Sequence, residues 1–235
     1  MKKRFYFLIA GILLVLASAI FFLLFKFNFI LLGSVEGECK MILENAGADK
    51  IDMVFLTNDV SENEVQKYVN FFLASEPFAS NKEKFNFYYA GESDCEIIQG
   101  KAVYCYSRDL LKQSSVCPND FIIVLSEEAT NIRSSAYMNV VSLNIKNSKT
   151  VILHEFGHVF SNLADEYVPS IIPWGAKNCQ DECDDFEEFG TLEGCYIGCS
   201  KADIFRSIEN SVMRTLGTDE FGEFNTMLKT EDLDK

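Results

Sequence analysis

The only two histidines of the chain, His154 and His158, lie four residues apart with Glu155 between them. Apolar residues from 151 to 160 surround them and predict a helix. A spacing of four places both imidazoles on one helix face, about 6 Å apart along its axis, where both can bind one metal ion. We therefore expect His154 and His158 to be metal ligands, with Glu155 beside that face. The competing interpretation is a core helix that buries both imidazoles and binds nothing.

Zinc is the expected metal, because it binds imidazole nitrogen and carboxylate oxygen and keeps one position open for water. A bound Zn2+ lowers the pKa of that water toward about 7. Glu155 is then placed to act as general base, taking the proton as the water attacks a peptide carbonyl. Cobalt and manganese accept similar ligands, so zinc is a choice made on ligand type.

The third protein ligand must come from beyond the helix. Asp165 lies seven residues past His158, so an unbroken helix would carry it about 10 Å along the axis, too far for a bond of about 2 Å. Asn162 can adopt the left-handed conformation that ends a helix, after which the chain can fold back toward the metal. Asp165 is the expected ligand and Glu166 the alternative; a solvated acidic loop is the opposing interpretation.

Residues 154–167, HEFGHVFSNLADEY, resemble the active-site signature of the immunoglobulin A peptidase family of secreted zinc metallopeptidases. That signature is an HExxH helix followed by a Leu-Ala-Asp-Glu-Tyr turn, and a weaker similarity extends over most of the chain beyond residue 33. The resemblance implies a zincin-like domain that hydrolyses peptide bonds, with His154, His158 and Asp165 as zinc ligands and Glu155 as the catalytic residue.

Two other segments bear on this resemblance. Residues 211–214, Ser-Val-Met-Arg, resemble the methionine turn that lies beneath the metal in related metallopeptidases, which implies that Met213 forms an apolar floor under the histidines. Residues 57–60, Thr-Asn-Asp-Val, depart from the Gly-Asp-Gly-Tyr type of turn that the family tends to have, so the substrate contacts there are left open. Tyr167 could donate a hydrogen bond to the oxyanion, but we expect it to pack against its neighbours.

The surrounding sequence predicts alternating strands and helices. Short apolar runs predict buried strands at 51–56, 85–89, 121–125 and 138–145. Ser61 and Glu64 form a predicted capping box that starts a helix ending near Pro77, and Ser148 or Thr150 is expected to start the histidine helix. This order predicts an α/β (α+β) fold with a mixed sheet over residues 34–235.

The first 33 residues predict a membrane anchor. Lys2, Lys3 and Arg4 precede an uninterrupted apolar run from 5 to 25, long enough to span a bilayer as one transmembrane helix. The basic residues predict a single-pass protein with a cytoplasmic N-terminus and everything beyond residue 33 outside. A cleaved leader is the alternative, but large apolar residues follow the only small-residue patch at 17–19.

The part of the chain beyond residue 33 is rich in cysteines and acidic residues. All eight cysteines follow the apolar run, which favours disulfides in an oxidising compartment. Two Cys-x-x-x-Cys pairs on antiparallel helical turns would bridge Cys179 to Cys199 and Cys183 to Cys195, whereas a four-cysteine zinc site is the alternative. Beyond residue 33 the chain has 17 basic and 35 acidic residues, a net charge of −18. Such a surface disfavours nucleic acid and anionic lipid.

The sequence thus predicts a membrane-anchored zinc endopeptidase whose substrates are proteins or peptides. An extended substrate is expected beside a strand edge near the histidine helix, within 138–143. The alternatives are a catalytically silent surface binding module that keeps the metal, and a disulfide-stapled structural domain without one. Because Glu155 is present, nothing in the sequence disables catalysis.

Overall fold

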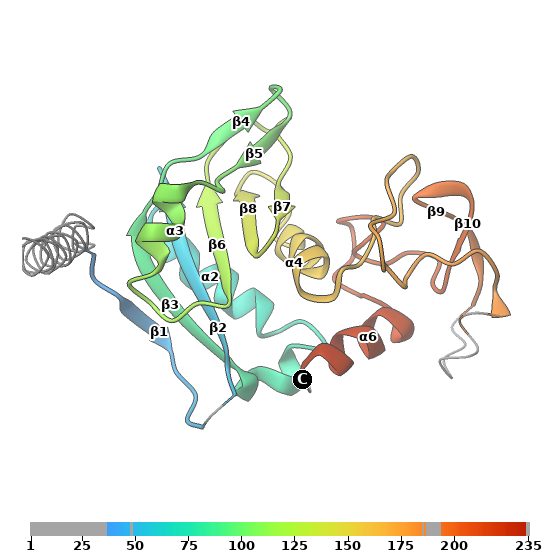
Figure 1. Cartoon of the computed structure of the whole chain (residues 1–235), viewed down its shortest axis with the longest axis horizontal. Helices are drawn as coiled ribbons and strands as arrows, with labels where there is room; N and C mark the ends of the chain where they lie inside the picture. The colour runs from blue at the N-terminus through green and yellow to red at the C-terminus, as the bar shows by residue number, and fades with distance from the viewer. Residues whose placement is uncertain (1–36, 48, 185, 187–193, 234–235) are drawn as a thin grey trace, which may run out of the picture. The chain divides into compact units, whose positions relative to one another are not determined.

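The computed structural model describes residues 37–233, apart from 48, 185 and 187–193. The anchor predicted within residues 1–33 lies outside the described residues, and no helix in the described part is long and apolar enough to cross a membrane. Figure 1 labels the elements, whose bounds are β1 (Lys40–Leu43), β2 (Ile51–Asn58), α2 (Glu62–Phe72), η1 (Ala79–Lys84), β3 (Phe85–Glu92), β4 (Glu96–Ile98), β5 (Ala102–Tyr104), α3 (Arg108–Ser114), β6 (Phe121–Ser126), β7 (Ser135–Tyr137), β8 (Val140–Asn144), α4 (Val151–Ser161), β9 (Tyr196–Cys199), β10 (Lys201–Arg206) and α6 (Glu223–Leu233).

A mixed six-stranded sheet is the centre of the fold, with strand order β1-β3-β2-β6-β8-β7. The four inner strands, β3, β2, β6 and β8, run parallel to one another, whereas β1 and β7 at the two edges pair antiparallel with their neighbours. The inner strands are nearly continuous apolar runs, which suits strands covered on both faces. The predicted mixed α/β class is therefore confirmed.

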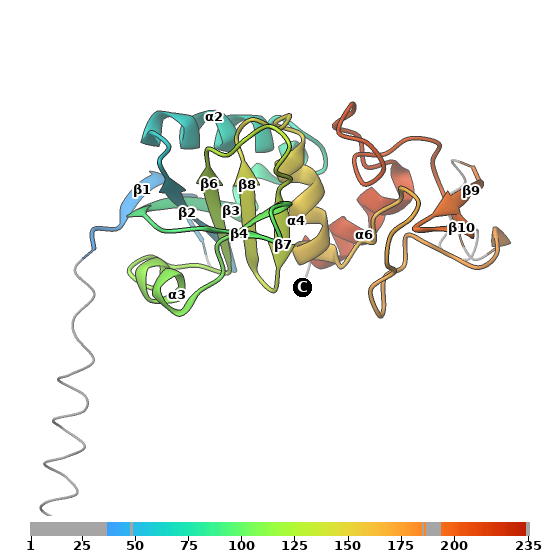
Figure 2. The same cartoon turned by 90° about the horizontal axis from the view of Figure 1, so that it is seen from above.

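Helices cover both faces of this sheet, and α2 and α3 lie on opposite sides of it (Figure 2). The alternation of side chains along β2 divides the core: Met53 and Phe55 face α2, α4 and α6, while Val54 and Leu56 face α3 and the β4–β5 hairpin. Eight more buried phenylalanines belong to the first cluster; they are Phe72, Phe78, Phe85, Phe87, Phe156, Phe186, Phe221 and Phe224. The histidine helix α4 is thus packed in the larger core.

The strand predictions are confirmed for β2, β3 and β6, with two corrections elsewhere. The run predicted at 138–145 forms β8 only from Val140, because Met138 has a positive φ of 54° in the turn that joins β7 to β8. Consequently β7, and not the predicted 138–143, is the edge strand beside α4. Ser61 lies at the N-cap of α2 but makes no side-chain cap hydrogen bond, so the predicted capping box does not form.

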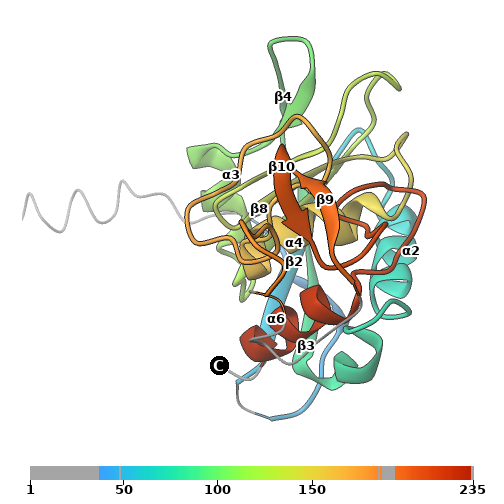
Figure 3. The ribbon, with the colours of Figure 1, turned by 90° about the vertical axis from the view of Figure 1, so that its right-hand side faces the viewer.

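Four disulfides join the eight cysteines, and no cysteine is free. The predicted bridges Cys179–Cys199 and Cys183–Cys195 are present. They do not staple a helical hairpin, however, because Cys199 ends strand β9 of the β9–β10 ribbon, which faces the viewer in Figure 3. The remaining bridges, Cys39–Cys117 and Cys95–Cys105, pack against the α3 side of the sheet.

Lys229 of α6 is fully buried among aromatic rings. Its Nζ lies 4.1 Å from the ring centroid of Phe221, 5.5 Å from that of Phe78 and 5.8 Å from that of Phe160, and it has no hydrogen-bond partner among the described residues. The rings favour the ammonium form, but desolvation of a buried ion costs more than cation–π contacts return. Burial accordingly lowers the pKa of Lys229 to about 7, opposed by the charge of Asp232.

We expect Lys229→Met to raise the free energy of unfolding near pH 7, by up to about 4 kcal/mol. Lys229 loses its proton near pH 7 in the folded chain and near 10.4 in the unfolded chain. Because the unfolded chain binds more protons between these values, wild-type stability rises with pH across the window, and the advantage of Lys229→Met should shrink toward about pH 10.

Urea denaturation of both proteins over this pH range measures the difference. The control is Lys112→Met, on the exposed surface of α3, for which no pH trend is expected. A constant advantage of Lys229→Met from about pH 7 to pH 10 would contradict the lowered pKa.

Candidate metal centre

Helix α4 carries both histidines and ends where the sequence predicts. Thr150 is the N-cap, and its Oγ1 donates a hydrogen bond of 2.7 Å to the carbonyl of Leu216. Asn162 ends the helix in the left-handed conformation, with φ 50° and ψ 36°, and the Leu163 amide bonds to the Gly157 carbonyl. The chain therefore reverses after one residue, as a left-handed C-terminal residue allows, and residues 163–167 return past the helix.

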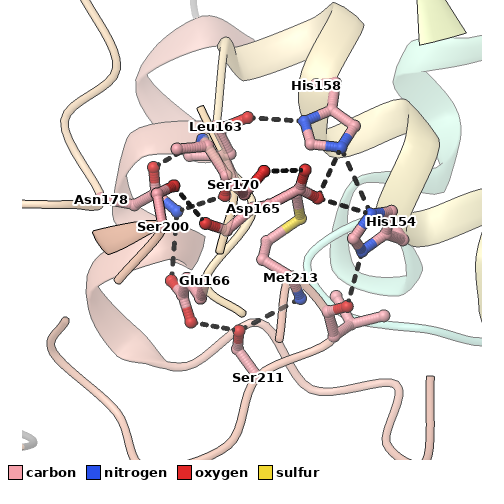
Figure 4. A network of polar contacts seen from close by, with 12 residues as sticks. His154, His158, Leu163, Asp165, Glu166, Ser170, Asn178, Ser200, Ser211 and Met213 are labelled. Atoms are coloured by element: carbon pink, nitrogen blue, oxygen red, sulfur yellow. Dashed lines mark hydrogen bonds and ion pairs between the residues drawn. The ribbon is translucent and has the colours of Figure 1, made fainter. Parts of the chain in front are cut away.

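This reversal brings three ligand-type atoms together, as Figure 4 shows. Nε2 of His154 lies 3.2 Å from Nε2 of His158. Asp165 Oδ1 lies 3.0 Å from the first of these nitrogens and 3.3 Å from the second. Within the part of the chain that the structure describes, this is the one group of three or more histidine, cysteine and acidic side chains whose ligand atoms converge.

The tautomers of both imidazoles are fixed by peptide carbonyls. His154 Nδ1 lies 2.9 Å from the carbonyl oxygen of Val212, and His158 Nδ1 lies 2.7 Å from that of Leu163. A carbonyl only accepts hydrogen bonds, so each Nδ1 carries a proton and each neutral Nε2 presents a lone pair. Two lone pairs and a carboxylate oxygen thus face one another without a donor, an arrangement that a cation satisfies.

The electrostatics agree with this requirement. Burial opposes ionisation of Asp165, but whenever an imidazole is protonated at Nε2 its hydrogen bond and charge outweigh burial and hold the pKa of Asp165 well below its usual range. Burial lowers the pKa of His154, yet Asp165, Glu155 and the Val212 carbonyl together raise it. The site therefore stabilises positive charge at its centre, and a metal ion would fit there in place of a shared proton.

Asp165 is held in position by three polar side chains. Ser170 Oγ donates to Oδ2 at 2.8 Å, which leaves Oδ1 directed at the imidazoles, and Ser200 Oγ donates to the Asp165 carbonyl at 2.6 Å. The Asn178 side chain bonds to both the amide and the carbonyl of Ala164, at 2.7 and 2.9 Å. Because Asn178 precedes the bridged Cys179, the Cys179–Cys199 disulfide helps to place the carboxylate.

Glu166, the alternative third ligand, is a buried hydrogen-bond acceptor and does not lie beside the imidazoles. Its side chain is fully buried away from the imidazoles and accepts hydrogen bonds from Ser211 at 2.5 Å, Asn225 at 2.9 Å and Asn178 at 3.1 Å. Burial raises the pKa of Glu166, and these three donors oppose the rise. Glu166 therefore links three separate segments, and its carboxylate is not among the converging ligand atoms.

Met213 lies against α4 on the side of Gly157. The Met213 side chain is fully buried, and its carbonyl accepts the Glu166 amide at 2.9 Å. A Cβ at Gly157 would lie only 2.7 Å from Met213 Sδ, so a side chain at this helix position would require the Met213 side chain to shift. Residues 211–214 thus form a turn beside the histidine helix. The Val212 carbonyl of this turn accepts the hydrogen bond from His154 Nδ1.

A cavity of about 350 Å³ opens over the two imidazoles and Asp165, and Glu155 lines it. Burial raises the pKa of Glu155, while the charges of His154 and His158 lower it. Tyr167 lines the same cavity with its ring 6.5 Å from that of His154. Burial and then the charge of Asp165 raise the pKa of Tyr167 to about 12, so its phenol stays protonated at neutral pH.

No family model matches the sequence, and no curated protein matches it. The resemblance to immunoglobulin A peptidases therefore stays a prediction that rests on residues 154–167 and the segments discussed with them.

We expect Asp165→Ala to lower the affinity for a divalent metal by about a hundredfold or more, because it removes the anionic member of the triad. Glu166→Ala should lower it far less and should instead lower the free energy of unfolding by about 3 kcal/mol, because three buried donors lose their acceptor. Calorimetric titration with zinc or cobalt measures the first quantity, and urea denaturation the second. The reverse ranking of metal affinities would assign the third ligand to Glu166.

Proposed function

We propose that the chain is a zinc-dependent endopeptidase of zincin-like fold, tethered to a membrane by residues 1–33. The observation that carries the proposal is the convergence of His154, His158 and Asp165 at the floor of a cavity that Glu155 also lines. Zinc bonds of about 2.0 Å at tetrahedral angles separate ligand atoms by about 3.3 Å. The observed separations of 3.0, 3.2 and 3.3 Å are close to this value.

A zinc ion held by these residues would supply a Lewis acid that polarises a peptide carbonyl and acidifies an attacking water. The protein then supplies the proton transfers. Glu155 accepts the proton of the attacking water and returns it to the leaving amine. The Val212 and Leu163 carbonyls keep both imidazoles in the tautomer that presents Nε2. Ser170 keeps the second carboxylate oxygen of Asp165 occupied.

The substrate backbone is proposed to lie along the edge strand β7. Ser135 and Ala136 of this strand line the cavity, and β7 pairs with β8 on one side only. An extended peptide can therefore add to the sheet at this edge, next to α4. The scissile bond would then pass over the imidazoles, between β7 and the turn that contains Tyr167.

The proposed location outside the cytoplasm draws on two features. The four disulfides are typical of proteins that fold in an oxidising compartment. The basic residues before the apolar run indicate a cytoplasmic N-terminus, which puts the described residues on the far side of the membrane.

We expect Glu155→Gln to keep about one zinc per chain and to lower peptide hydrolysis by about a thousandfold, because the amide cannot accept the proton. His158→Ala should lose both the metal and the activity. Elemental analysis and hydrolysis of an unstructured protein such as casein measure the two quantities. Undiminished hydrolysis by metal-loaded Glu155→Gln would overturn the mechanism, and a metal-loaded wild-type protein that cleaves nothing would favour the silent binding module.

A further inference from the structure

Two arginines line the cavity of a protein whose surface is strongly acidic. Arg133 and Arg214 are on its walls, and its acidic lining residues are Glu155 and Asp165. Asp165 is directed at the two imidazoles, and the charge of Arg133 acts on Glu155, whose pKa it lowers against the effect of burial. The lining thus combines two basic and two acidic side chains, although the chain as a whole has a formal net charge of −14.

The two arginines differ in how their donors are used. Arg214 Nη1 donates to the carbonyls of Glu166 and Gly198, at 3.1 and 3.2 Å, which ties it to the wall. The side chain of Arg133 is exposed and makes no hydrogen bond or ion pair with any described residue. Arg133 is still close enough to the cavity to act on Tyr167, where its charge opposes the effects of burial and of Asp165.

The backbone that carries Arg133 is firmly held. Its amide donates to the Lys101 carbonyl at 2.9 Å, and its carbonyl accepts the Val103 amide at 3.0 Å. Its neighbours Ile132 and Ser134 are buried, and the Cys95–Cys105 disulfide closes the β4–β5 hairpin to which this backbone is bonded. The guanidinium is therefore an unpaired charge on a fixed support, which favours precise recognition of a ligand.

A guanidinium binds carboxylates through paired, charge-assisted hydrogen bonds. Arg133 immediately precedes the buried Ser134 and lies two residues before β7, the strand along which the peptide is proposed to bind. A side chain from a peptide in that position would meet Arg133 next to the scissile bond.

We propose that Arg133 is a specificity-determining residue that selects peptides with a carboxylate close to the scissile bond. This inference rests on the proposed function, because it assumes that peptides bind along β7. The carboxylate has two sources, an Asp or Glu side chain within the peptide or the free C-terminus of a peptide cut near its end. An acidic side chain fits an endopeptidase.

The test measures binding separately from catalysis. The zinc-loaded Glu155→Gln protein is titrated with fluorescent octapeptides that carry one Asp, Asn or Lys at each position of an otherwise neutral sequence. Each peptide is made with a free and with an amidated C-terminus. We expect Asp at one or two positions to bind about tenfold more tightly than Asn, and we expect amidation to leave this ratio unchanged.

Adding Arg133→Gln should bring the Asp/Asn ratio close to one, and Arg133→Glu should shift the preference to Lys. Arg108→Gln is the matched control, since Arg108 is exposed at the start of α3 and does not line the cavity; it should leave the ratio intact. A ratio near one before Arg133 is changed, a ratio that persists after Arg133→Gln, or no peptide binding would overturn the inference. A preference that disappears on amidation would reassign Arg133 to the C-terminal carboxylate.

Hydrolysis of the same peptides by the wild-type protein separates the two proposals. Cleavage of Asp and Asn peptides at equal kcat/KM would overturn the role of Arg133 and leave the peptidase standing. Arg133-dependent binding without cleavage of any peptide would overturn the peptidase and support carboxylate recognition by a binding protein.

Discussion

Two peptide carbonyls determine what the centre of this protein can do. The Val212 and Leu163 oxygens accept the Nδ1 protons of His154 and His158, so both Nε2 lone pairs converge on Asp165. Each carbonyl is positioned by a turn of the chain. The Val212 carbonyl belongs to the turn at 211–214, and the Leu163 carbonyl reaches His158 because α4 ends at Asn162. The turn at 211–214 and the end of α4 at Asn162 hold these two oxygens beside the imidazoles.

A buried carboxylate provides much of that support. Glu166 receives donors from residues 178, 211 and 225, which lie in three segments with no regular pairing between them. Desolvation makes such a group costly unless every donor is present, and this cost is what makes the arrangement specific. A carboxylate directed away from the imidazoles thus helps to fix the neighbouring Asp165, which does lie beside the histidines.

The sequence predicts those features that depend on local chemistry. Apolar runs identify the inner strands, and Asn162 predicts where α4 ends because few other residues adopt a positive φ readily. Features that depend on approach between distant segments were missed: the network of Glu166, the unpaired side chain of Arg133 and the edge strand β7. Nothing in their own neighbourhoods marks them, since an acidic pair or an arginine before serines is common on protein surfaces. Likewise, the Cys-x-x-x-Cys spacing predicts two of the four disulfides correctly, although Cys199 ends a strand and not the helical turn assumed for it. The other two depend on which distant segments become neighbours.

Gly157 and Met213 are in close contact between the histidine helix α4 and the turn at 211–214. A helix interior ordinarily disfavours glycine, yet a methyl group at 157 would meet the methionine sulfur at 2.7 Å and the Phe221 ring at 3.5 Å. A side chain at 157 therefore requires the Met213 side chain to move or to become shorter. In descendants of this sequence the two sites should vary as a pair, so that an alanine at 157 is accompanied by a shorter side chain at 213. Paired substitutions at 157 and 213 would therefore be the evolutionary sign of this contact.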